Sequence, residues 1–306
     1  MTTAEASGRR PVTLRDIRGR GRIRGTAGVL GPAFVASVAY VDPGNFATNF
    51  AGGAEQGYEL VWVIVMANLM AIGVQYLTSK AGLATGQSLP ELCRDRFSRR
   101  VNALLWLQAE VVAMATDLAE FVGAAVGLNL VFGVPLFPAG LITALVAFVI
   151  LGLERRGYRR FELAIIALLA LVGLGFLYVF IAVGGQHYPQ IACGLLPHLA
   201  GGDGVRLTVG IIGATVMPHI VYLHSELHKD RIRTGTCRER RTLLTLSKWD
   251  CITGLGIAGV VNLSMLCIAA ALFHKRGWLT SVISGPSTHT SPRWLAAEPR
   301  WPSGSP

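Results

Sequence analysis

Long apolar stretches alternate with short polar gaps along most of the chain. A helix needs about 20 apolar residues to cross the hydrocarbon core of a bilayer. Seven stretches approach or exceed that length, and they lie near residues 26–50, 60–79, 101–132, 135–153, 161–183, 207–227 and 251–273. This pattern predicts an all-α polytopic membrane protein with about seven transmembrane helices.

The two ends of the chain depart from the pattern. Residues 1–25 are rich in arginine and predict a basic cytoplasmic segment, whereas residues 26–274 form the expected transmembrane domain. Residues 275–306 are aperiodic and rich in Ser and Pro, so we expect disorder there. A basic start followed by an apolar stretch also suggests a signal peptide, but this stretch is long and is interrupted near Asp42, which favours a first transmembrane span.

Basic residues gather in alternate gaps between the predicted spans. Lys and Arg are frequent in residues 1–25, 80–100, 154–160 and 228–250, and they are nearly absent from the gaps between those segments. Because short cytoplasmic loops carry the Lys and Arg excess, all four segments are placed in the cytoplasm. We therefore expect a multi-pass protein of the cell membrane with a cytoplasmic N-terminus.

The composition excludes several other classes of protein. Hydrophobic residues make up 52% of the 306 positions and charged residues only 15%, which is unlike a soluble globular protein. The net charge of +10 does not indicate nucleic acid as a partner, because the basic residues lie between apolar stretches. The five cysteines form no CxxC pair, so neither a disulfide framework nor a zinc ribbon is expected.

Helix-breaking residues interrupt the first span beside groups that bind cations. Pro43 lacks an amide proton and Gly44 accepts unusual dihedral angles, so the helix is expected to break there and to expose carbonyl groups. Asp42 and Asn45 flank the break with a carboxylate and an amide, which together predict a cation site. The alternative is a simple proline kink, with Asp42 near the outer membrane interface.

The sixth span is interrupted in a similar way by Pro218, between Met217 and His219. A thioether beside oxygen ligands favours Mn, Fe, Co or Cd over Mg and Ca. A methionine in an apolar helix is, however, commonly only a core residue. His219 and His224 are candidate metal ligands, proton carriers or hydrogen-bonded core histidines. Of these roles, proton handling is favoured for His219.

Three acidic residues follow one face of the third span. Glu110, Asp117 and Glu120 are spaced by seven and three residues, which places them on the same side of a helix. Carboxylates at membrane depth are costly, and a row of them is typical of a proton relay or a water-lined face. A salt-bridged structural set is the alternative, but the spans contain no obvious cationic partner.

Several of these motifs resemble the Nramp family of manganese and iron transporters. The sequence has Asp-Pro-Gly-Asn at 42–45, Thr-Asp-Leu-Ala-Glu at 116–120 and Met-Pro-His at 217–219, in that order. The resemblance implies the leucine-transporter type of inverted repeat, with the first and sixth helices unwound at the substrate. It also implies proton-coupled uptake of Mn²⁺ or Fe²⁺ as substrate, without a resident cofactor.

The resemblance also implies roles for individual residues. The side chains of Asp42, Asn45 and Met217 would be metal ligands, joined by the backbone carbonyls of Ala39 and Ala214. Proton movement would use His219, Glu120, Asp117 and Glu110, with His224 as a possible auxiliary. One position departs from the family pattern, since Ile220 stands where the family usually has Asn, and a polar contact at the restart of the sixth helix is expected to be missing.

Family members have about eleven spans, so this sequence is expected to hold the first repeat and the start of the second. The change in composition after residue 274 resembles a frameshift or a truncated gene. Two alternatives to a functional transporter remain. One is a truncated remnant of such a transporter that no longer transports metal. The other is a metal-dependent intramembrane enzyme, which the absence of GlyXaaSerXaaGly and HisGluXaaXaaHis motifs disfavours.

Overall fold

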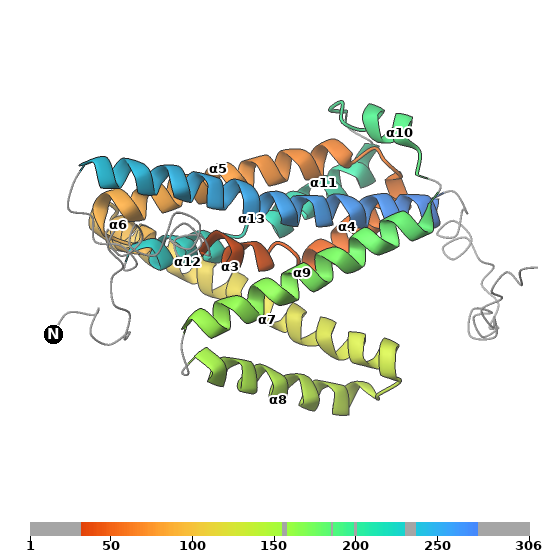
Figure 1. The fold of residues 1–306 in the computed structure, drawn as a ribbon, viewed down its shortest axis with the longest axis horizontal. Helices are drawn as coiled ribbons and strands as arrows, with labels where there is room; N and C mark the ends of the chain where they lie inside the picture. The colour runs from red at the N-terminus through yellow and green to blue at the C-terminus, as the bar shows by residue number, and fades with distance from the viewer. Residues whose placement is uncertain (1–31, 155–157, 185, 199–200, 230–236, 275–306) are drawn as a thin grey trace, which may run out of the picture.

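The computed structural model describes residues 32–154, 158–184, 186–198, 201–229 and 237–274, and within these ranges the regular secondary structure is entirely helical (Figure 1). The basic N-terminal segment and the Ser- and Pro-rich tail predicted at the two ends therefore lie outside the described residues. The helices are α3 (Pro32–Val38), α4 (Pro43–Gln56), α5 (Val61–Thr85), α6 (Leu89–Arg96), α7 (Arg99–Phe132), α8 (Leu136–Glu154), α9 (Tyr158–Val183), α10 (Tyr188–Cys193), α11 (Gly201–Thr215), α12 (Pro218–Lys229) and α13 (Cys237–Leu272).

Five helical segments within the described ranges are long and apolar enough to cross a membrane, and they fall in α5, α7, α9, α11–α12 and α13. The first predicted span is divided between α3, with 7 residues, and α4, with 14. The fourth corresponds to α8, which contains a shorter apolar segment. The all-α polytopic fold predicted from the apolar stretches is therefore confirmed.

Both predicted helix interruptions are present. The chain leaves helical geometry between Val38 and Pro43, and again between Thr215 and Pro218. In each case a proline occupies the first position of the restarting helix, where its missing N–H is not needed for a helical hydrogen bond. The prediction of broken first and sixth spans is thus confirmed. Each break lies before its proline rather than after it, so Asn45 and His219 belong to the restarted helices.

Helix α13 lies at the centre of the bundle and contacts α3, α4, α5 and α9 (Figure 1). Two apolar clusters pack against its residues 251–270. One joins α5 and α11 to α13 through residues such as Leu60, Ile211 and Leu266. The other joins α3, α5 and α12 to α13 through residues such as Tyr40, Met217 and Leu255. The core is therefore built around the two broken helices and fixes their relative positions.

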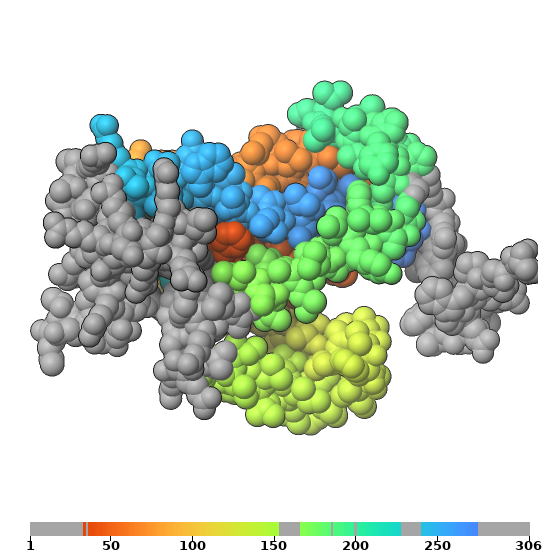
Figure 2. All heavy atoms as spheres, viewed as in Figure 1, coloured from red at the N-terminus to blue at the C-terminus, as the bar shows by residue number. Residues whose placement is uncertain are grey.

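Helices α7 and α8 pack against each other and protrude from this body (Figure 2). Their outward faces carry large exposed apolar side chains, including Leu104, Leu130, Phe137 and Phe148. Such a continuous apolar surface is unfavourable in water but suits the hydrocarbon of a bilayer. At its inner edge α7 reaches α4, because Gly123 lacks a side chain where Pro43 lies against it.

Candidate metal site

The two prolines that restart the broken helices release two specific carbonyl groups. In a continuous helix the N–H of each residue bonds to the carbonyl four positions earlier, and proline cannot make that bond. Counting back four residues from Pro43 and Pro218 gives Ala39 and Ala214. The carbonyls that the family resemblance implies as ligands are therefore those that the prolines leave without a helical donor.

Asp42 caps the amino end of α4. Its Oδ1 atom accepts hydrogen bonds from the backbone N–H of Asn45, at 2.8 Å, and from the Asn45 side-chain amide, at 2.7 Å. Asp42 is 8% exposed and Asn45 is fully buried. Within the described chain no hydrogen bond to Asp42 Oδ2 is present, so one carboxylate oxygen remains available to a cation.

Asn45 joins the two interruptions directly. Its Nδ2 donates to the carbonyl oxygen of Ala214 at 3.0 Å. The hydroxyl of Thr215 lies 3.0 Å from Asn45 Oδ1 and 2.7 Å from the Ile211 carbonyl oxygen, and its single proton serves one or the other. The interruptions therefore face each other, and Thr215 is a polar contributor that the sequence interpretation did not single out.

Met217 is buried next to the end of α3. It packs in the same cluster as Ala36 and Tyr40, with Ala39 partly buried against that cluster. This places a soft thioether side chain beside the segment that ends at Asp42. Ile220 is buried in the same cluster, so the residue that departs from the family pattern contributes apolar packing to the start of α12.

The donors gathered at the interruptions are of mixed type. Among the described residues, no three His, Cys, Asp or Glu side chains lie close enough to hold a metal ion together. The groups near the interruptions are one carboxylate, an amide, a thioether and backbone carbonyls. Such a set of oxygen and sulfur donors suits a borderline transition-metal ion better than Ca²⁺ or Mg²⁺.

His219 and part of the acidic stripe lie near this site. The carboxylates of Asp117 and Asp42 both act electrostatically on the His219 ring, and the same two groups act on Glu120. The His219 Nδ1 atom is buried and has no hydrogen-bond partner within the described ranges. The tertiary structure thus groups these four titratable side chains around the break in α3–α4.

Glu110 belongs to a different place. It lies on the same face of α7, but it lines a cavity bounded by α6 and α12 rather than the helix interruptions. His224 is also set apart, because it is fully buried with its Nδ1 atom 2.8 Å from Gln75 Oε1. Of the ten candidate site residues, these two are the ones that the fold separates from the metal site.

A buried polar network that the sequence interpretation missed holds the end of α3. Gln75 of α5 donates to the Tyr40 hydroxyl at 2.8 Å. Asn262 of α13 donates to the Tyr40 carbonyl at 2.9 Å and accepts from Asn49 of α4 at 3.1 Å. Polar amides within apolar spans were the available signal, since each is costly in a membrane unless it has a role.

Replacing Asn262 with leucine is expected to destabilise the protein by about 1–3 kcal/mol for each buried group left unpaired. The Tyr40 carbonyl and the Asn49 amide would both lose their partner. Thermal unfolding in detergent measures the effect. Thr253→Val is the matched control on α13, because the Thr253 hydroxyl bonds to carbonyls of its own helix and, in the described part of the chain, to no other helix. Equal unfolding temperatures for the two variants would contradict the structural role of the network.

Comparison with known proteins agrees with the fold and with the motifs. The family model described as natural resistance-associated macrophage protein-like, or Nramp, matches residues 33–285. The divalent metal cation transporter MntH of Deinococcus radiodurans is 48% identical over 270 residues, covering 85% of this chain and 62% of the relative. MntH of Bacillus subtilis is 48% identical over 262 residues, covering 84% of this chain and 61% of the relative.

A solved structure gives the same result at the level of the fold. The manganese transporter of Eremococcus coleocola, crystallised with an aromatic bis-isothiourea compound, is 32% identical to this chain and superposes with a TM-score of 0.76. The match covers 89% of this chain and 58% of that structure. The chain therefore spans about three fifths of the length of the relatives that it matches.

Proposed function

This chain belongs to the Nramp family, and from that premise we propose that it binds Mn²⁺ or Fe²⁺ between its two helix interruptions for proton-coupled transport across the cell membrane into the cytoplasm. The observation that carries the proposal is the pairing of α4 with α11 through Asn45 and Ala214. This contact brings a carboxylate, an amide and a freed carbonyl to one place in the fold.

The donor set supports a transition metal as the substrate. Asp42 supplies the only carboxylate among the proposed ligands and Met217 the only sulfur, while Asn45, Ala39 and Ala214 supply neutral oxygen atoms. A single negative charge with a soft ligand favours Mn²⁺ and Fe²⁺ over the harder Ca²⁺. The related MntH proteins are named as divalent metal cation transporters, which agrees with this choice.

The arrangement of titratable groups supports coupling to protons. The carboxylates of Asp42 and Asp117 act electrostatically on His219 and on Glu120. A cation bound at Asp42 would therefore favour loss of a proton from His219 or Glu120. We place the N-terminus in the cytoplasm on the distribution of basic residues. In this orientation Glu110 lies on the cytoplasmic side of the stripe, because α7 begins at the basic segment around Arg99 and Arg100.

Transport is tested in a chimera in which residues 33–274 replace the matching segment of Deinococcus MntH. In proteoliposomes with an inward proton gradient, we expect Mn²⁺ uptake that falls several-fold when the gradient is collapsed. Uptake that is indifferent to the gradient would contradict proton coupling. A chimera that binds Mn²⁺ but transports none would contradict transport while leaving the metal site in place.

Replacing Met217 with alanine is expected to weaken rejection of Ca²⁺ more than binding of Mn²⁺. The change removes the only sulfur ligand and leaves oxygen donors that suit hard cations. Competition between Mn²⁺ and Ca²⁺, measured on the purified chain in nanodiscs, should show the selectivity ratio falling about tenfold or more, which corresponds to about 1.4 kcal/mol. Met66→Ala is the control, because Met66 is an exposed methionine of α5 that belongs to neither apolar cluster. An unchanged ratio in Met217→Ala would exclude the proposed role of the thioether.

A further inference from the structure

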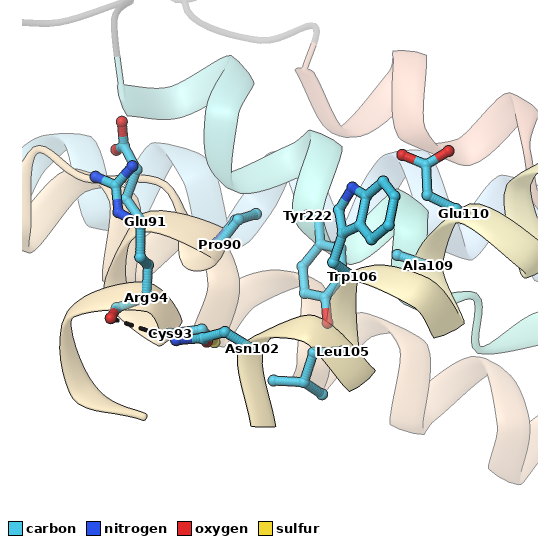
Figure 3. A pocket seen from close by; sticks show the side chains of 10 residues that line it. All are labelled: Pro90, Glu91, Cys93, Arg94, Asn102, Leu105, Trp106, Ala109, Glu110 and Tyr222. Carbon is cyan, nitrogen blue, oxygen red and sulfur yellow. Dashed lines mark hydrogen bonds between the residues drawn. The ribbon is translucent and has the colours of Figure 1, made fainter. Parts of the chain in front are cut away.

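A cavity of about 440 Å³ lies between α6, α7 and α12, apart from the candidate metal site (Figure 3). One of its walls is a single face of α7, since the residues that α7 contributes are spaced by three and four positions. They are Asn102, Leu105, Trp106, Ala109 and Glu110. Tyr222 of α12 closes the opposite side, and none of the proposed metal ligands lines the cavity.

Some polar groups of the cavity are already used by the scaffold. Glu91 accepts a hydrogen bond from the backbone N–H of Ser88 at 2.8 Å and so caps α6. The amide of Asn102 lies 3.1 Å from the carbonyl oxygen of Phe97 and 3.4 Å from that of Arg94, and its donation to them caps the other end of the same helix. Glu91 therefore serves the start of α6, and Asn102 holds the end of α6 against α7.

Three other lining side chains have no such partner. Within the described ranges no hydrogen bond or ion pair involves the Glu110 carboxylate, the Trp106 indole N–H or the Tyr222 hydroxyl. Figure 3 shows the Trp106 ring between Tyr222 and Glu110, with Glu91 and Arg94 at the far end of the cavity. A carboxylate and two aromatic rings thus lie at the same end of the cavity, away from Glu91 and Arg94.

The position of Glu110 in the membrane makes its missing partner costly. It follows Arg99, the first residue of α7, by eleven positions, which places it about 16 Å further along the helix. With Arg99 at the membrane surface, Glu110 lies within the hydrocarbon region, where a charged side chain costs about 2.5–3.5 kcal/mol on insertion scales. A cation bound beside it would offset part of this cost.

We propose that this cavity binds a small organic cation that carries an aromatic ring, with its ammonium group at Glu110 and its ring against Trp106 and Tyr222. Aromatic faces attract cations as well as other rings, so the two contacts reinforce each other. The volume lies within the range of small-molecule sites, and the lining is mainly apolar with few polar groups, as such sites are. A bare divalent metal ion is disfavoured because it needs several oxygen ligands, and only one carboxylate is free.

The proposal is tested with two probes of similar size and shape, one carrying a charged ammonium group and the other a neutral hydroxyl group. Phenethylammonium and 2-phenylethanol share a ring and a two-carbon chain, and neither absorbs where tryptophan is excited. With the 306-residue chain in nanodiscs, we expect phenethylammonium to bind at least tenfold more tightly than 2-phenylethanol, as followed by tryptophan fluorescence. Equal affinities, or no saturable binding, would overturn the proposal.

Variants identify the groups responsible. Glu110→Gln should lower the affinity for phenethylammonium about tenfold and leave that for 2-phenylethanol unchanged. Trp106→Ala should weaken binding of both, and it is followed by isothermal titration because the variant lacks the indole that reports on the site. Asp117→Asn is the matched control, because Asp117 lies on the same helix face but does not line the cavity. If Asp117→Asn lowers the affinity for phenethylammonium as much as Glu110→Gln does, the cation is attracted by the summed negative charge of the acidic residues on α7. That result would overturn the proposed binding site.

A measurement on the unmodified protein removes any dependence on variant folding. Cys93 lines the cavity and is partly buried, while Cys193 is exposed elsewhere. Burial raises the pKa of the Cys93 thiol and makes alkylation slow, so alkylation is followed over hours near pH 8, where the phenethylammonium probe keeps its charge. Phenethylammonium should slow alkylation of Cys93 several-fold and leave Cys193 unaffected, as read by mass spectrometry. Absence of protection at saturating phenethylammonium would overturn the proposal independently of the variants.

Discussion

Replacing Asp42 with alanine is expected to lower the affinity for Mn²⁺ by about 100-fold or more, which corresponds to about 2.8 kcal/mol or more. Asp42 is the only anionic group among the proposed ligands, and its Oδ2 atom is the oxygen that the scaffold leaves unused. Isothermal titration of the purified chain in nanodiscs with Mn²⁺ measures the change.

The alanine variant also loses the cap of α4, which costs about 0.5–2 kcal/mol of stability. Asp42→Asn separates the two effects, because it keeps a capping oxygen and removes the charge. We expect Asp42→Asn to lose most of the Mn²⁺ affinity with a smaller decrease in unfolding temperature. Asp95→Ala, at an exposed position on α6, is the control for general loss of negative charge. Full Mn²⁺ affinity in Asp42→Asn would rule out the carboxylate as a ligand.

Replacing Gly53 with alanine is expected to destabilise the fold by about 3 kcal/mol or more, because the added methyl group has no space. A Cβ atom at Gly53 would overlap the backbone carbonyl oxygen of Leu266 and lie 2.9 Å from the Cβ atom of Ala269. Both belong to α13, so the clash cannot be relieved by rotating a side chain. Thermal unfolding in detergent should show a large decrease in the midpoint.

Gly73→Ala provides the matched control for this prediction. Gly73 lies in α5 with open space around the position of a Cβ atom. Removing a glycine from a helix interior favours the helix by about 0.8–1 kcal/mol, so this variant should be as stable as the parent or slightly more so. If both variants unfold at the parent temperature, α4 and α13 do not pack as closely as the structure shows.

The prediction of broken helices succeeded because a proline acts locally. Pro43 and Pro218 remove a helical hydrogen bond wherever they occur in a helix interior, and this needs no knowledge of the fold. The same local rule singles out Ala39 and Ala214 as the carbonyls without a helical donor. Here the family resemblance and the chemistry of the backbone lead to the same residues.

The acidic stripe shows where the sequence interpretation fell short. Helical periodicity placed Glu110, Asp117 and Glu120 on one face, and this follows from the geometry of α7 alone. What each carboxylate meets depends on the neighbouring helices. Glu120 and Asp117 lie near His219 and Asp42, whereas Glu110 lines the cavity between α6, α7 and α12. Periodicity carries no information about which helix passes beside each turn.

The sequence by itself determined the properties that depend on neighbouring residues: an all-helical membrane protein, its apolar segments, the two proline interruptions and the polar groups beside them. Only the tertiary structure decided which distant groups meet, such as Asn45 with Ala214 and Thr215, or Tyr40 with Gln75 and Asn262. The reason is physical. Helix formation and breakage depend on hydrogen bonds between residues four positions apart. The contacts named above join residues that are 35 to 222 positions apart. They form only when the apolar clusters around α13 bring their helices together.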